Sequence, residues 1–140
     1  MSSLYLIALG SNRRHHRFGL PRNVLCAAME ELTALGTVAA RSSIITTAPI
    51  GPAQRRFANA ACVMESEYDP PSLLVGLKHI ESEFGRRGAQ RWSDRVLDLD
   101  IVLWSEGVFE GAGLSIPHQE YASRDFVLRP ALEVAPDWRD

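Results

Sequence analysis

The sequence predicts an α+β fold, in which an antiparallel sheet is covered on one face by two helices. Strand-like and helical patterns follow one another in the order βαββαβ. Glycine, proline and small polar residues separate them, as is typical of turns. At 140 residues, with 46% hydrophobic and 23% charged residues, the chain has the size and balance of one globular domain. We therefore expect a single domain over residues 1–140.

The first three predicted elements are a strand, a helix and a strand. Residues 4–9 form a short apolar run that ends in a Gly-Ser-Asn turn, which favours a buried strand. Pro21 suits the first turn of a helix, and Gly36 stops it. The apolar positions with helical spacing between them are Leu25, Ala28, Met29, Leu32 and Leu35. Residues 38–47 are rich in β-branched and small side chains, which indicates the second strand.

The next three elements repeat this order. A Pro/Gly-containing segment at 48–52 precedes a third strand at 58–68. Asp69 is a good N-cap for a second helix that Gly85 ends. Its apolar face consists of Leu73, Leu77, Ile80 and Phe84. A fourth strand at 96–104 completes the βαββαβ order of ferredoxin-like folds. We expect a C-terminal extension beyond it, with a short helix that Ser123 caps and Pro130 interrupts.

Composition narrows the class of function. The net charge of −2 argues against general nucleic-acid or membrane binding, because such binding relies on excess positive charge. The apolar runs are too short to cross a bilayer, and residues 1–10 lack the pattern of a signal peptide. Cys26 and Cys62 match small, reduced core residues rather than a disulfide framework. We expect a soluble, cytoplasmic monomer.

The fourth strand carries two carboxylates at alternate positions. Aspartate is depleted in strands, so Asp98 and Asp100 within a β-forming run require an explanation. Residues i and i+2 of a strand share a face and lie about 7 Å apart, so both carboxylates point together while Leu97, Leu99 and Ile101 point into the core. Such a pair can bind hard cations that carry phosphate oxygens. A solvated acidic face on an edge strand is the alternative, and this stretch alone leaves both open.

Four arginines precede these aspartates within ten positions: Arg86, Arg87, Arg91 and Arg95. Guanidinium groups bind phosphate oxygens in a bidentate manner. Because Lys78 is the sole lysine of the chain, any single arginine can equally be a plain surface residue. The chain has no Gly-x-x-x-x-Gly-Lys motif and no pattern typical of an activated nucleophile. These features favour direct transfer between two bound substrates.

Four separated motifs occur between residues 4 and 136. They are Ala8-Leu9-Gly10-Ser11-Asn12; Thr47-Ala48-Pro49-Ile50-Gly51-Pro52 with Phe57-Ala58-Asn59-Ala60-Ala61; the run at 91–101; and Ile116-Pro117-His118 with Arg124-Asp125-Phe126. In this order they resemble the 6-hydroxymethyl-7,8-dihydropterin pyrophosphokinase family. The resemblance implies a ferredoxin-like α+β sandwich. It also implies transfer of pyrophosphate from ATP to the hydroxymethyl group of a reduced pterin, with release of AMP, in folate biosynthesis.

The resemblance also implies roles for individual residues. Asp98 and Asp100 would bind two Mg²⁺ ions, and Arg95 with one or both of Arg86 and Arg87 would neutralise the transferring group. The implied pterin-binding residues are Thr47, Ile50, Phe57, Asn59 and Phe126. The implied ATP-binding residues are Glu81, Arg91, Trp92, Ile101, Ser115, His118 and Arg124, with backbone groups serving near Ile101 and Ser115. Taken alone, the two phenylalanines and the histidine match ordinary core or surface residues, and only their motifs favour binding.

One departure and two alternatives accompany this interpretation. Ser93-Asp94 stand where the family usually has Gly-Pro, so we expect closure of this loop over the substrates to differ. An RNA-binding module shares the βαββαβ order, but the chain lacks the aromatic motif of such modules. A non-catalytic small-molecule-binding domain of the same fold would leave the aspartate pair and the arginines without a common task.

Overall fold

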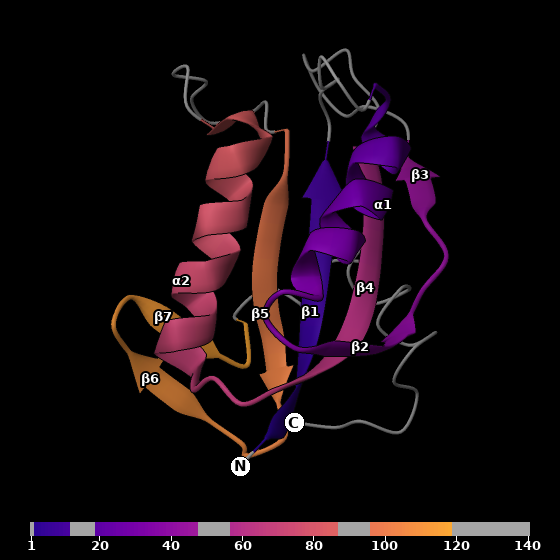
Figure 1. The fold of residues 1–140 in the computed structure, drawn as a ribbon. Helices are drawn as coiled ribbons and strands as arrows, with labels where there is room; N and C mark the ends of the chain where they lie inside the picture. The colour runs from indigo at the N-terminus through magenta and orange to yellow at the C-terminus, as the bar shows by residue number, and fades with distance from the viewer. Residues whose placement is uncertain (1, 12–18, 48–56, 87–95, 119–140) are drawn as a thin grey trace.

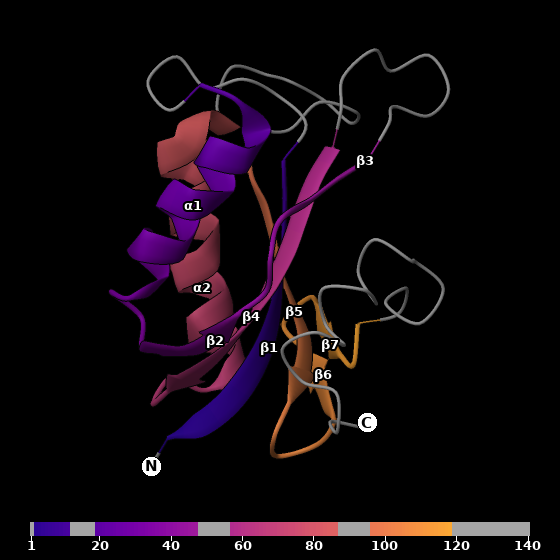
Figure 2. The ribbon, with the colours of Figure 1, turned by 90° about the vertical axis from the view of Figure 1, so that its right-hand side faces the viewer.

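In the computed structural model, two helices lie side by side on one face of an antiparallel sheet (Figure 1). The structure describes residues 2–11, 19–47, 57–86 and 96–118, with the backbone alone at Thr47, Phe57 and Arg86. Viewed along the edge of the sheet, no described helix covers the opposite face (Figure 2). This two-layer α+β arrangement is the one that the sequence predicts.

The sheet has the strand order β2-β4-β1-β5, and all of these neighbours are antiparallel. The strands are β1 (Ser3–Ser11), β2 (Thr37–Arg41), β4 (Phe57–Ser66) and β5 (Asp98–Trp104). β1 is therefore central, with β4 on one side and β5 at an edge. The first and third predicted strands thus lie next to each other, with the fourth beside the first, as in ferredoxin-like folds.

The strand predicted at 38–47 is two strands in the structure, so this prediction is corrected. β2 ends at Arg41 and β3 (Ile45–Thr47) begins after a break, and both pair with β4. Ser42 lies in the break: its backbone N–H donates to the Ala61 carbonyl at 2.8 Å, and its hydroxyl accepts from the Ala61 N–H at 2.9 Å. The Ser42 hydroxyl thus accepts a hydrogen bond that a backbone carbonyl would accept in a regular β ladder. The hydrophobic pattern of the sequence does not indicate such a bond.

The two helices begin and bury their apolar faces as the sequence predicts. α1 (Pro21–Leu32) starts at a proline, and its buried residues are Val24, Leu25, Ala28, Met29 and Leu32. α2 (Pro70–Glu81) is capped by Asp69, whose carboxylate accepts from the Ser72 N–H at 3.0 Å. It continues into a π-helical turn, η1 (Ser82–Arg86), where Gly85 adopts φ +100° and ends the helix. Among the described residues, no helix combines the length and apolar character needed to span a membrane.

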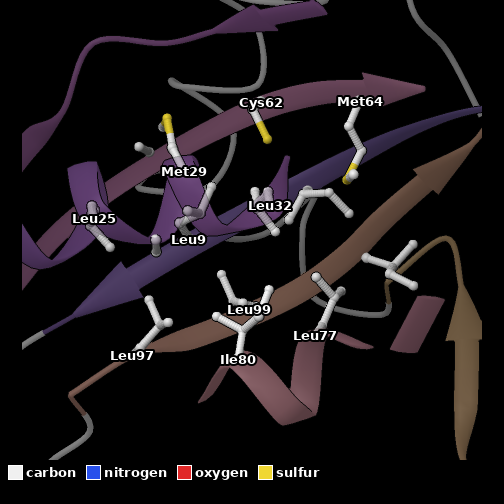
Figure 3. Close-up of a cluster of buried hydrophobic side chains, with 14 of the residues drawn as sticks. Leu9, Leu25, Met29, Leu32, Cys62, Met64, Leu77, Ile80, Leu97 and Leu99 are labelled. Atoms are coloured by element: carbon white, nitrogen blue, oxygen red, sulfur yellow. The ribbon is translucent and has the colours of Figure 1, made fainter. Parts of the chain in front are cut away.

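The main core lies between the helices and the sheet (Figure 3). In Figure 3 the labelled α1 side chains lie next to β1 and β4, and the labelled α2 side chains lie next to β5. Cys62 is buried there, and this burial raises the pKa of its thiol to about 12. Cys26 is exposed, so its predicted place in the core is wrong. It follows Leu25 on the helix and so falls just outside the buried face.

A short hairpin after β5 is missing from the predicted elements. It comprises β6 (Phe109–Gly111) and β7 (Leu114–Ile116), joined through Ala112 and Gly113, which both adopt positive φ. Strands of three residues are too short to show a periodicity. The hairpin leads to His118, whose backbone N–H donates to the Val102 carbonyl of β5 at 3.0 Å. The helix predicted near Ser123 lies outside the described residues.

Candidate active site

The candidate site lies on the sheet face away from the helices. At the end of β1, Gly10 pairs with Asn59 of β4 on one side and with Asp98 of β5 on the other. The neighbours of Asn59 and Asp98 in the sequence belong to the helix-covered core, so alternation turns these two side chains to the face away from the helices. Since adjacent strands are about 4.8 Å apart, Asn59 and Asp98 lie about 10 Å apart across Gly10 at the backbone.

Small residues form the floor between these polar groups. Next along the sheet, Ala8 pairs with Ala61 on one side and with Asp100 on the other. A Cβ atom added to Gly10 would lie 3.3 Å from the Asn59 Oδ1 atom, so a larger residue would crowd that amide. Glycine and alanine carry no large side chain that would keep a ligand away from this part of the central strand.

The aspartate pair is half-buried on β5. Burial raises the pKa of Asp100 above its ordinary value, and the negative charges of Asp98 and then Glu81 raise it further. His118 and Lys78 act in the opposite direction. β5 is an edge strand, as the alternative interpretation required, but its acidic face is not fully solvated. A bound cation would offset the repulsion between the two negative charges of this pair.

The donor set can be tested against Mg²⁺. The described residues contain no group of three or more His, Cys, Asp or Glu side chains placed to bind a metal. Mg²⁺ is commonly held by only one or two carboxylates, with phosphate oxygens and water completing its octahedron. Asp98 and Asp100, two oxygen donors on one face, fit that chemistry.

Asn59 presents an unusual buried amide. Its side chain is 6% exposed, and its Nδ2 atom has no hydrogen-bond partner among the described residues. A buried donor without a partner costs about 1–3 kcal/mol. An acceptor on a ligand that reached this floor would remove that cost.

Glu81 approaches the aspartates from α2. It is 1% exposed, and its Oε2 atom accepts from the backbone N–H of Leu99 at 2.7 Å. Its Oε1 atom lies 3.3 Å from the Lys78 ammonium. Leu99 separates Asp98 from Asp100, so Glu81 contacts the backbone that carries both carboxylates.

Residues 6–136 match the family model described as 7,8-dihydro-6-hydroxymethylpterin-pyrophosphokinase, HPPK. The chain belongs to this family. It is 37% identical over 134 residues to the 2-amino-4-hydroxy-6-hydroxymethyldihydropteridine pyrophosphokinase of Haemophilus influenzae, covering 94% of this chain and 81% of the relative. The enzyme of the same name from Pseudomonas aeruginosa is 38% identical over 136 residues, with 95% and 81% covered.

A solved structure supports the fold. Wild-type HPPK-DHPS of Plasmodium falciparum, crystallised with SDX-DHP, matches with a TM-score of 0.77 at 14% identity. The match covers 99% of this chain and 42% of that one, so this chain spans about two fifths of the solved protein. At this identity the likeness shows the fold alone, and it agrees with the predicted ferredoxin-like arrangement.

The structure places some of the predicted site residues beside the Asn59 end of the sheet and others on the β6-β7 hairpin and after it. Thr47 pairs with Phe57 at the ends of β3 and β4, next to the Asn59 end of the floor. Ile101 turns its side chain into the covered core, so only its backbone remains available for the expected contact with ATP. The Ser115 hydroxyl donates to the Glu110 carboxylate at 2.9 Å, and His118 is half-buried beyond β7.

Other predicted HPPK residues lie outside the described residues. They are Ile50, Arg87, Arg91, Trp92, Arg95, Arg124 and Phe126. Ser93 and Asp94 also lie outside the described residues. The described chain reaches the segment 87–95 at Arg86 and resumes at Val96. A Cβ atom added to Gly85 would lie 3.8 Å from the Val96 Cγ2 atom, so η1 ends close to the start of β5.

Sequence reasoning missed two features of this site. One is the small-residue floor, whose signal is the alternation of Ala8 and Gly10 in an otherwise aliphatic strand. The other is Lys78, which precedes Glu81 by three positions and so shares its helix face.

Proposed function

We propose that this chain transfers the β,γ-pyrophosphoryl group of ATP to the hydroxymethyl oxygen of 6-hydroxymethyl-7,8-dihydropterin, forming AMP and the pterin diphosphate in folate biosynthesis. The row Asn59, Gly10, Asp98 across three adjacent strands carries this proposal. It sets a carboxylate and an amide whose Nδ2 atom has no partner among the described residues on opposite sides of a glycine floor. HPPK family membership supports the reaction class.

Asn59 would hold the pterin. Its amide offers both a donor and an acceptor, which matches the edge of a flat heterocycle that carries both kinds of group. The Nδ2 atom would gain the partner that it lacks among the described residues. Thr47, Ile50, Phe57 and Phe126 complete the proposed pterin pocket.

Asp98 and Asp100 would hold Mg²⁺, two ions in our proposal. When bound, the metal neutralises negative charge on the phosphate oxygens. The carboxylates would thereby set where the phosphates bind, and the strand position of Asp98 is about 10 Å from that of Asn59 at the backbone. Holding both substrates on one rigid floor supplies the proximity that direct transfer needs.

The remaining ATP contacts are proposed from the motifs. Arg86, Arg87 and Arg95 would neutralise the transferring group. Arg91 and Trp92 would close over the substrates and exclude water. The other proposed ATP contacts are Glu81, Ile101, Ser115, His118 and Arg124. The cytoplasmic location, the monomeric state and the single domain over residues 1–140 stay predictions.

The test is an incubation of the protein with ATP, Mg²⁺ and 6-hydroxymethyl-7,8-dihydropterin, followed by separation of the nucleotides. We expect AMP and pterin diphosphate in equal amounts, and no product when EDTA removes the metal. Formation of ADP, or folded protein without metal-dependent transfer, would overturn the proposal. Pterin binding without AMP would instead support the non-catalytic binding domain.

A further inference from the structure

The outer edge of β5 is closed by groups from other elements. β5 pairs with β1 on one side, and no strand pairs with its other side within the described residues. At such an edge, the outward N–H and C=O groups of the strand have no partner strand to bind. Two of them are capped: the Val102 carbonyl by the backbone N–H of His118, and the Leu99 N–H by the carboxylate of Glu81.

The Glu81 contact lies between the two aspartates of this edge strand. Leu99 is buried, and the peptide units on its two sides lead to Asp98 and Asp100. A rotation of the Leu99 backbone would therefore move both carboxylates. The bond of 2.7 Å from the Leu99 N–H is short, as expected when a carboxylate is the acceptor.

The burial of Glu81 is costly for stability. A carboxylate that is 1% exposed has lost nearly all contact with water. Proteins contain such buried carboxylates where hydrogen-bond donors of the protein take the place of water. Each Glu81 oxygen has such a donor, Leu99 for Oε2 and Lys78 for Oε1. A protein with an apolar residue at this position of the helix would commonly be as stable as the wild type. This indicates that Glu81 has a role other than stabilising the fold.

We propose that Glu81 is a positioning residue, which holds Asp98 and Asp100 in register through the Leu99 N–H, with Lys78 orienting its carboxylate. This inference rests on the proposed function for its catalytic meaning. It changes the role of Glu81 from a direct contact of ATP to a support for the groups that hold the metal and the phosphates. Partners of this kind are worth about 10–100-fold in metal affinity or activity.

Two substitutions separate positioning from direct binding. Glu81→Gln keeps an oxygen that can accept the Leu99 N–H, whereas Glu81→Leu removes the acceptor. We expect kcat of Glu81→Gln within about tenfold of wild type, and a loss of about 100-fold with a higher Mg²⁺ requirement in Glu81→Leu. Equal losses in both variants would assign Glu81 to direct binding of ATP or metal, and would overturn the proposal.

Amide hydrogen exchange gives a readout that does not depend on activity. We expect the Leu99 amide to exchange slowly in the free wild-type protein and in Glu81→Gln, and rapidly in Glu81→Leu. Circular dichroism establishes that each variant is folded. If Glu81→Leu does not fold, the wild type and Glu81→Gln still decide, because rapid exchange of the Leu99 amide in either would overturn the proposal.

Glu83 provides a matched control. It is exposed on η1, and its carboxylate lies 3.4 Å from the His79 imidazole of the same helical segment. We expect Glu83→Gln and Glu83→Leu to leave kcat, the Mg²⁺ requirement and Leu99 exchange unchanged. A wild-type protein that forms no AMP would refute the proposed function, whereas slow Leu99 exchange would still show the Glu81 contact. The two failures are therefore distinguishable.

Discussion

The two faces of the sheet are built from alternate residues of the same strands, and they carry different properties. On β5, Leu99 and Ile101 are buried under the helices, whereas Asp98 and Asp100 are half-buried on the other face. On β4, Asn59 stands in the same relation to the alanines on its two sides. The strand period of two therefore separates the residues that stabilise the fold from those that would bind substrates.

The sheet face away from the helices has two parts. Away from Asp98, it carries a second buried apolar cluster of Leu6, Ala61, Val63, Val102 and Leu103. Ala61 belongs to this cluster and also pairs with Ala8 in the floor of the site. The proposed site residues Asn59, Asp98 and Asp100 thus lie together at one end of this face. Substitutions on the two faces should change different measurements.

The largest expected effect is on the polar side of this comparison. Asp98→Ala or Asp100→Ala removes a proposed metal ligand, whose loss costs several kcal/mol of transition-state stabilisation. We expect AMP formation to fall by about 10³-fold or more, with circular dichroism and the unfolding midpoint showing an intact fold. Near-normal turnover would return these residues to a simple surface role.

Leu99→Ala tests the covered face at the position between those aspartates. The side chain is fully buried, so we expect the free energy of unfolding to fall by about 2–5 kcal/mol in urea titrations. The backbone N–H that donates to Glu81 is retained. Turnover per folded molecule should therefore stay within a few-fold of wild type, and a loss like that of Asp98→Ala would erase the distinction between the faces.

These two faces also explain how much the sequence predicts. Burial follows the periods of helix and strand, so Leu73 and Leu77 on α2 and the opposite orientations of Leu99 and Asp98 are predictable. The break at Ser42 is not, because a hydroxyl stands in for a backbone group while β-branched residues continue. The boundary of a buried helix face is equally hard to predict, hence the error at Cys26.

The sequence indicates residues of the site but not the contacts between them. The shared face of Asp98 and Asp100 leaves a cation site and a solvated acidic face equally open, and only the resemblance to HPPK favours the cation site. Asn59 is indicated by that resemblance alone. The contact of Glu81 with Leu99 joins residues 18 positions apart on a helix and a strand edge. No local pattern encodes such a contact, because it depends on how α2 sits beside β5.

A smaller effect is expected from crowding the floor. Gly10→Ala would place a methyl group 3.3 Å from the Asn59 Oδ1 atom, so the amide must shift by a few tenths of an ångström. We expect the KM for the pterin to rise by about tenfold, a change of about 1.4 kcal/mol, while the KM for ATP stays constant. Steady-state kinetics with each substrate varied in turn measures both values. Equal rises in the two KM values would contradict separate sites on the floor.

The smallest effect concerns the stability of the metal-free protein. Because the pKa of Asp100 is raised on folding, its ionisation opposes folding once the pH exceeds the ordinary carboxyl value of 3.8, and fully so above the raised pKa. Asp100→Asn should therefore melt at a higher temperature than wild type near neutral pH. The gain should vanish as the pH falls below the ordinary carboxyl range.

Asp69 provides the control of opposite sign. The hydrogen bonds from Ser72 lower the pKa of the Asp69 carboxyl, so its contribution to stability is present above the ordinary carboxyl value and is lost as the pH falls through the lowered pKa. Asp69→Asn keeps a good N-cap but removes this charge. It should melt below wild type at neutral pH and converge with it in acid. If both variants shifted the melting temperature in the same direction in EDTA, the raised pKa of Asp100, caused first by burial and then by the charge of Asp98, would not explain the change.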